Sequence, residues 1–143
     1  MHITYKGDYA LKAVLDLASH YGKGVVKIQD LAQRLDIPQK FLEQVLLTLK
    51  RGGFVESKRG MNGGYFLARN PKEIKIGQVL RFIDGPIEPI ACVVKNYKGC
   101  RQIDDCVLRP IWTKVSKTIS DIIDKISFEE VRNQTKKQRK NIT

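Results

Sequence analysis

Two short helical patterns separated by a tight break constrain the fold of this chain more than any other feature. The apolar residues of Gln29–Leu35 and of Gln39–Arg51 recur at helical spacing, and Asp36-Ile37-Pro38 separates the two segments. Pro38 fits the first turn of the second helix, and Gly52-Gly53 fit its C-terminal cap. The spacing in the second helix predicts that five apolar residues face inward: Phe41, Leu42, Val45, Leu46 and Leu49.

A glycine-rich hairpin pattern follows the second helix directly. Phe54–Lys58 and Tyr65–Ala68 are predicted strands, and three of the six residues between them are glycines. Two helices joined by a tight turn and followed by such a hairpin are the element order of a winged helix-turn-helix. The predicted fold class is therefore mainly α with a small β-hairpin wing.

Three further helical patterns surround this unit. Asp8–Tyr21 and Ile76–Ile83 predict core helices, whereas residues 87–109 show no clean period. An apolar stripe from Ile111 to Ile126 predicts a long amphipathic C-terminal helix. Little of the chain is left to cover that stripe, so we expect a second copy to do so in a homodimer.

These patterns divide the chain into four parts. We expect a winged helix-turn-helix DNA-binding domain over residues 1–85, a cysteine segment over 86–109 and a dimerisation helix over 110–131. The remaining residues, 132–143, contain five basic side chains, no acidic one and one apolar one. We expect this basic tail to be disordered.

The charge of the chain indicates an anionic partner. The sequence has 26 Lys and Arg residues against 15 Asp and Glu residues, a formal net charge of +11 and a pI near 9.7. Nucleic acid is the first partner to consider. No apolar run approaches the roughly 18 residues of a membrane span, and MHITYKGDYA lacks the regions of a signal peptide, so we expect a cytoplasmic protein without a membrane partner.

Polar residues lie where a winged helix-turn-helix reads double-stranded DNA. Four of them face away from the apolar side of the second helix, near its N-terminus: Gln39, Lys40, Glu43 and Gln44. At the predicted wing tip the candidates are Ser57, Lys58, Arg59 and Gly60, with Arg59 the first candidate for insertion into the minor groove. The alternative is a solvated helix face beside an ordinary surface hairpin.

The three cysteines all lie in the cysteine segment. Cys92, Cys100 and Cys106 form a C-x7-C-x5-C pattern with several cations nearby, and such cations partly offset the negative charge of a thiolate-ligated cluster. Three thiolates on an irregular segment can converge on an iron–sulfur cluster. A regulatory thiol pair and three unrelated cysteines remain alternatives, since the pattern has no C-x2-C pair.

Three runs of the sequence resemble the signature of the Rrf2 family of winged-helix transcription regulators. They are FLEQ at 41–44, LKRGGFVESKRG at 49–60 and GGYFLAR at 63–69, and the opening KGDYAL at 6–11 is also similar. The resemblance extends over about residues 1–130. It implies a homodimer that packs through the C-terminal helix and binds an imperfect DNA palindrome.

The resemblance also bears on the cysteines. Cluster-binding members, of the IscR and NsrR types, have three cysteines in this stretch and hold a 2Fe-2S or 4Fe-4S cluster, although their first gap is commonly shorter. Arg109 stands where IscR-type members have a histidine ligand, and an arginine does not ligate iron. Asp8 matches the acidic ligand that NsrR-type members take from the other subunit. Its alternative role is that of an N-cap or first-turn acid.

Three functions follow from these observations. The main hypothesis is a DNA-binding transcription regulator, a repressor, whose operator binding responds to iron–sulfur, redox or nitric oxide status through the cluster. The second is a cluster-free regulator of the CymR type, controlled by a partner protein or by thiol oxidation. The third, a small redox protein, conflicts with the winged pattern and the charge. No catalytic triad, paired-carboxylate or phosphate-loop motif is present, so we expect no enzyme activity.

Overall fold

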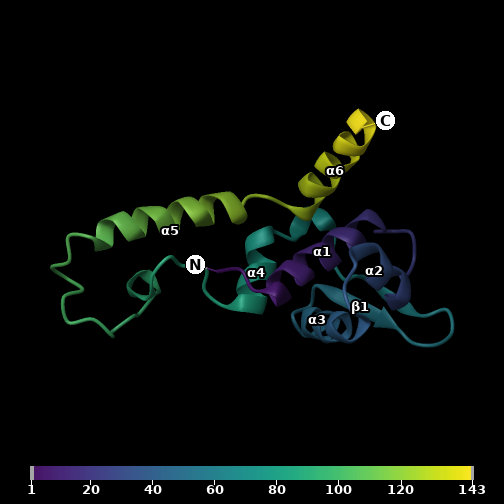
Figure 1. The fold of residues 1–143 in the computed structure, drawn as a ribbon, viewed down its shortest axis with the longest axis horizontal. Helices are drawn as coiled ribbons and strands as arrows, with labels where there is room; N and C mark the ends of the chain where they lie inside the picture. Colours follow the sequence, from purple (N-terminus) through teal and green to yellow (C-terminus); the bar gives the residue numbers. More distant parts are fainter. Residues whose placement is uncertain (1, 143) are drawn as a thin grey trace.

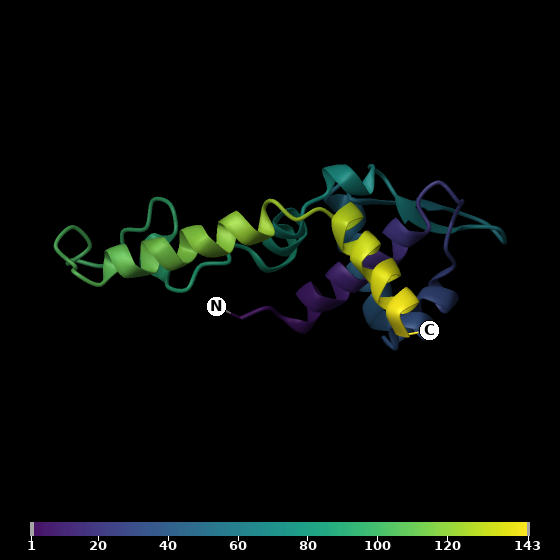
Figure 2. The ribbon, with the colours of Figure 1, turned by 90° about the horizontal axis from the view of Figure 1, so that it is seen from above.

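A computed structural model describes residues 2–142, so the predictions that include Met1 and Thr143 lie partly outside it. The elements in chain order are α1 (Tyr5–Ser19), α2 (Ile28–Leu35), α3 (Gln39–Arg51), β1 (Val55–Lys58), β2 (Gly64–Leu67), η1 (Pro71–Glu73), α4 (Ile76–Asp84), η2 (Ala91–Val93), α5 (Arg109–Ile123) and α6 (Phe128–Ile142). The first four helices and the hairpin form the winged part, and α5 with the cysteine segment extends from it as an arm (Figure 1; Figure 2). The predicted fold class is confirmed.

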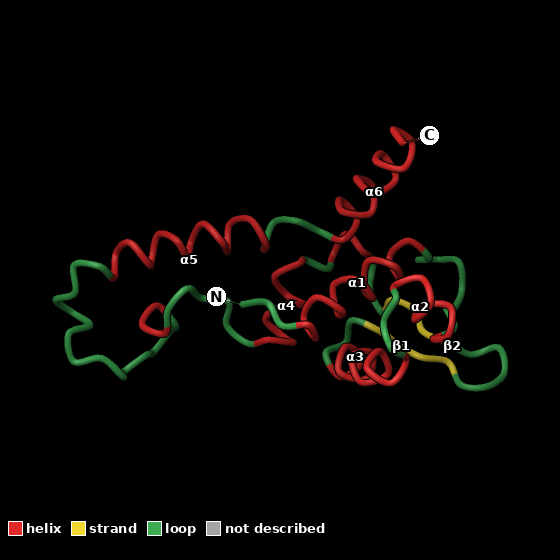
Figure 3. Tube along the Cα trace, in the orientation of Figure 1, coloured by secondary structure: helices red, strands yellow, loops and turns green. Residues whose placement is uncertain are grey.

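The wing is a two-stranded antiparallel hairpin, with a single β-bridge from the preceding connector beside it. Figure 3 shows the two strands, β1 and β2, in yellow. Val55 pairs with Leu67, and Lys58 pairs with Gly64 next to the tip. Val26, in the connector before α2, exchanges two backbone hydrogen bonds of 2.8 Å with Tyr65. This pairing attaches the connector before α2 to β2 of the wing.

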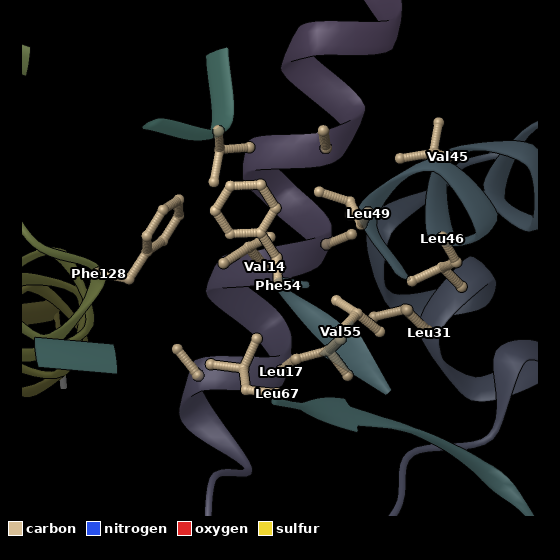
Figure 4. Close-up of a cluster of buried hydrophobic side chains, with 14 of the residues drawn as sticks. Val14, Leu17, Leu31, Val45, Leu46, Leu49, Phe54, Val55, Leu67 and Phe128 are labelled. Atoms are coloured by element: carbon tan, nitrogen blue, oxygen red, sulfur yellow. The ribbon is translucent and has the colours of Figure 1, made fainter. Parts of the chain in front are cut away.

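The core of the winged part forms around α1. Its apolar residues recur every three or four positions, so one face is fully buried: Ala10, Ala13, Val14, Leu17 and Ala18. Side chains from α2, α3, the hairpin and α6 pack around this face (Figure 4). Four of the α3 residues predicted to face inward are buried: Leu42, Val45, Leu46 and Leu49.

Helix α5 is shorter than the predicted dimerisation helix. It ends at Ile123, so the prediction of one helix over 110–131 is wrong. The last turn of α5 contacts Arg81 of α4, whose guanidinium donates to Asp124 and, at 3.0 Å, to Ser120 Oγ. The backbone then leaves the helix, because the Ile126 carbonyl accepts a hydrogen bond of 3.0 Å from the Ile76 N–H. Helix α5 runs back from the far end of the arm towards the winged part, and the chain then continues into α6 (Figure 1).

The basic tail is helical, so the prediction of a disordered tail over 132–143 is wrong for the described residues up to 142. Ser127 Oγ accepts a hydrogen bond of 3.2 Å from the Glu130 N–H, which caps the first turn of α6. The acidic first turn and the basic last turn also complement the helix dipole. Phe128 is 1% exposed in the core and anchors α6. None of the described helices is long and apolar enough to cross a bilayer.

Candidate nucleic-acid interface and cysteine segment

The predicted DNA-contacting residues of α3 are all exposed. Gln39, Lys40, Glu43 and Gln44 form a polar surface, called here the reading face, opposite the buried side of the helix. The Gln39 amide donates to Glu43 at 3.4 Å, so the two side chains lie together on this face. Phe41 is 57% exposed, so the prediction that it faces inward is wrong. Its side chain lines an open pocket of about 510 Å³ between the start of α1 and the start of α3, so it faces solvent there and not the core.

The wing tip depends on its glycines. Gly60 has φ = +106°, a conformation that L side chains rarely adopt. A Cβ at Gly63 would lie 2.1 Å from the Lys58 carbonyl oxygen. The chain can therefore turn sharply after Arg59 and present this cation at the tip, where Lys58 and Arg59 are both exposed.

A groove runs between the wing, the end of α3 and the start of α2, and has a volume of about 760 Å³. We call it the wing groove; its charged lining residues are Lys27, Asp30, Lys50, Lys58 and Arg59. The Lys50 ammonium donates to Ser57 Oγ at 2.7 Å and so joins α3 to the wing. The structure thus brings the predicted wing residues together with two cations that sequence reasoning missed, Lys27 and Lys50.

A sequence pattern could have predicted one of these two cations, Lys50, but not the other, Lys27. Lys50 follows Glu43 by seven residues, which places both on one face of a helix after two turns, so helical spacing could have identified it. Lys27 has no such signal. It reaches the groove because the neighbouring Val26 pairs with Tyr65 across the sheet.

The cysteines lie on the arm. Cys92 lies in η2 and is partly buried, Cys100 is exposed, and Cys106 is partly buried near the start of α5. All three are free thiols. Within residues 2–142 the structure does not gather three or more His, Cys, Asp or Glu side chains into a group that could hold a metal ion.

Arg109 and Asp8 are the two other positions at which the resemblance implies a cluster ligand. Arg109 lines a small pocket with Cys106 and donates to the Ile103 carbonyl at 3.5 Å, so it closes the segment against α5. Asp8 lies in the first turn of α1, 2.7 Å from the Lys12 ammonium, and through this hydrogen bond and its charge it raises the pKa of Lys12. Thr4, rather than Asp8, is the N-cap of this helix.

Comparison with known proteins places the chain in a family. The Rrf2 family model, described as "Iron-dependent Transcriptional regulator", matches residues 3–134. The HTH-type transcriptional regulator IscR of Pectobacterium carotovorum is 35% identical over 133 residues, covering 93% of this chain and 80% of that protein. A putative HTH-type transcriptional regulator, rrf2-like, of Rhodobacter capsulatus is 36% identical over 136 residues, covering 90% of this chain and 91% of the relative.

Solved structures agree with these relatives. CymR of B. subtilis, described as its global cysteine regulator, superposes with a TM-score of 0.78 at 27% identity, covering 94% of this chain and 98% of that one. T. potens IscR superposes with a TM-score of 0.77 at 32% identity, covering 94% of this chain and 88% of the other. The reading face, the wing and the family match together lead to one conclusion: the chain belongs to the Rrf2 family of winged helix-turn-helix transcription regulators.

Proposed function

We propose that this protein is a cytoplasmic, homodimeric, DNA-binding repressor whose operator affinity depends on an iron–sulfur cluster. The observation on which DNA binding rests is the exposed reading face of α3 beside the cationic wing groove. Both surfaces present groups that suit DNA, since polar side chains read base edges and cations bind phosphates. The relatives named as transcription regulators support the same function.

The reading face has the chemistry for direct base readout. Gln39 and Gln44 can each pair with adenine through two hydrogen bonds, and Glu43 can accept a hydrogen bond from cytosine. Arg59, at the exposed wing tip, can insert into a narrow minor groove. We therefore propose that α3 enters the major groove and that the wing lies along the neighbouring backbone.

The evidence for the proposed homodimer is the exposed apolar stripe of α5. No residue of this helix is buried, and Ile111 and Ile122 are 54% and 55% exposed. Val115 lies between them on the same face. Pairing of α5 with its copy would cover this stripe and hold two reading faces about one helical turn of DNA apart, as a palindrome requires.

The three cysteines provide the type of ligand atom that an iron–sulfur cluster requires. Thiolates are the usual ligands of iron–sulfur clusters, and Cys92, Cys100 and Cys106 are free and at least partly exposed. Asp8 of a second copy is the proposed fourth ligand, because it matches the acidic ligand that the resemblance to NsrR-type members implies and because Arg109 cannot ligate iron. When bound, the cluster would supply a centre that responds to oxidants, nitric oxide or iron supply.

The position of the cysteine segment suits control of operator affinity by the cluster. The segment joins α4 of the winged part to α5 of the proposed dimer interface. A change in its conformation when the cluster is bound or lost would therefore alter the spacing of the two reading faces. A coupling of about 1 to 3 kcal/mol would change operator occupancy roughly 5- to 150-fold.

The test uses protein reconstituted anaerobically with iron and sulfide. We expect visible absorbance, nearly equal iron and sulfide contents, and selection of one palindrome from a random duplex library. Cys92→Ala and Cys106→Ala should abolish the absorbance, and Asp8→Ala should alter the spectrum, whereas the exposed Asp36→Ala should not. A colourless protein whose operator binding is unaffected by Cys92→Ala would refute the cluster.

A second candidate, the cluster-free regulator of the CymR type, is favoured by two observations. The described chain keeps its thiols free and apart, and its fold superposes on CymR. This candidate predicts operator binding that iron does not change but that a partner protein or thiol oxidation does. The same reconstitution experiment separates the two.

A further inference from the structure

The pocket of about 510 Å³ between the start of α1 and the start of α3 lies beside the reading face, and it is called here the aromatic pocket. Small-molecule sites in proteins have volumes of about 300 to 1,000 Å³, so this pocket is large enough for such a ligand. Asp8, the proposed cluster ligand, lies outside its lining. The side chains that the argument uses come from both helices: Tyr5, Lys6 and Tyr9 from α1, and Phe41, Gln44 and Val45 from α3.

Three aromatic rings line the aromatic pocket, and solvent reaches them. Phe41 and Tyr5 are exposed, whereas Tyr9 is half-buried. The centroids of the Tyr5 and Tyr9 rings are 6.3 Å apart, and the ring planes are tilted by 40°. Exposed apolar side chains that gather around one depression are typical of a binding site, whereas single ones scattered over a surface are not. A planar aromatic ligand can pack against such rings in offset or edge-to-face contacts.

The walls of the aromatic pocket are fixed by contacts within the protein. The Thr4 N–H donates to the Asp84 carboxylate at 3.1 Å, and the Thr4 hydroxyl oxygen accepts from the Gly7 N–H at 3.0 Å, so the start of α1 is held against the end of α4. On the other side, Val45 is 2% exposed and belongs to the buried core (Figure 4), so it forms the floor. A ligand would therefore meet preformed walls, and little free energy would be lost in ordering them.

One cation, Lys6, lies at the aromatic pocket. Its ammonium makes no hydrogen bond or ion pair with another residue of the part of the chain that the structure describes, whereas Lys12, two turns further along α1, is paired with Asp8. None of the described residues that line the pocket is acidic. A carboxylate on the ligand would give the Lys6 ammonium a charge-assisted hydrogen bond without repulsion from the lining. Aromatic walls and an unpaired ammonium together indicate an aromatic carboxylate.

We propose that the aromatic pocket binds a small planar aromatic carboxylate and that this ligand lowers operator affinity. Gln44 lines the pocket and also belongs to the reading face, so a bound ligand would contact a side chain that the proposed function uses to read DNA. Ligand and operator therefore compete for Gln44. The effect on operator affinity rests on the proposed DNA binding, whereas the binding of the ligand does not.

The test titrates the full chain, without DNA, with benzoate and follows the backbone amide signals by NMR. We expect shifts confined to the starts of α1 and α3 and a Kd on the order of 1 mM. Cyclohexanecarboxylate, which has no aromatic ring, and benzamide, which has no charge, should each bind more weakly. Phe41→Ala should weaken benzoate binding about tenfold through the lost ring contact. Tyr21→Ala, at a ring 40% exposed beyond the end of α1, should leave it unchanged.

Two further measurements test the cation and the effect on DNA. Lys6→Gln should weaken benzoate binding roughly two- to fivefold, the effect of losing an exposed ion pair, and leave benzamide binding unchanged. Lys23→Gln, at an exposed lysine outside the pocket, should change neither. Saturating benzoate should lower the operator affinity of the wild type, whereas cyclohexanecarboxylate at the same concentration should lower it less.

Three results of the titration would overturn the proposed ligand site. They are the absence of benzoate-dependent shifts at the pocket, equal benzoate affinity of the wild type and Phe41→Ala, and dissociation of a dimer by benzoate, which would assign the pocket to a second copy. Benzoate binding without any change in operator affinity would overturn the proposed control. Failure of the wild type to bind any duplex would contradict the proposed function instead, and the titration without DNA would still test the pocket.

Discussion

Gly64 lies where the wing meets the connector before α2. A Cβ there would lie 2.4 Å from the Val26 carbonyl oxygen, which accepts the hydrogen bond that joins the connector to Tyr65. We expect Gly64→Ala to force the two backbones apart, to lower the free energy of unfolding by about 1 to 3 kcal/mol and to weaken DNA binding by displacing Lys27. Urea unfolding and operator titration would measure both effects. Asn62→Ala, exposed in the same turn, is the control, and equal effects of the two changes would contradict this role of Gly64.

The attachment of α6 depends on its first residues. Phe128 is 1% exposed, and its N–H donates to the Ile74 carbonyl at 3.0 Å. Further along, Arg132 donates to the Ala18 carbonyl at the end of α1, also at 3.0 Å. We expect Phe128→Ala to cost about 3 to 5 kcal/mol of stability, measured by urea unfolding. Phe66→Ala, at a side chain 38% exposed on β2, should cost under about 1 kcal/mol. Similar losses in the two variants would show that α6 is not anchored through Phe128.

At the scale of the whole molecule, the proposed homodimer would assemble through the apolar stripe of α5. We expect Ile122→Glu to place a charge in the apolar stripe, to yield a monomer and to weaken operator binding at least tenfold, because each monomer would then bind one half-site alone. Sedimentation and operator titration would measure these effects. Lys117→Glu, on the opposite face of the same helix, should leave the dimer intact. If the Ile122→Glu variant stays dimeric, the dimer interface does not lie on this stripe.

Local patterns predicted most of the winged part. The periodicity of α1, α3 and α4, Pro38 at the start of α3 and the glycines of the wing each act over a few residues, so the sequence displays them directly. The exposure of the reading face also follows from helical spacing. The capping pattern Ser127-x-x-Glu130 was a further local signal, and it could have predicted the start of α6.

The sequence by itself determined the fold class, the reading face, the wing tip and the presence of three cysteines on one segment. Only the tertiary structure decided that α5 ends near Arg81, that Phe128 holds the tail in the core, that Phe41 faces outward, and that Lys27 joins the wing groove. These outcomes depend on contacts between residues far apart in the chain. Such contacts are set by how the elements pack, which no local spacing records.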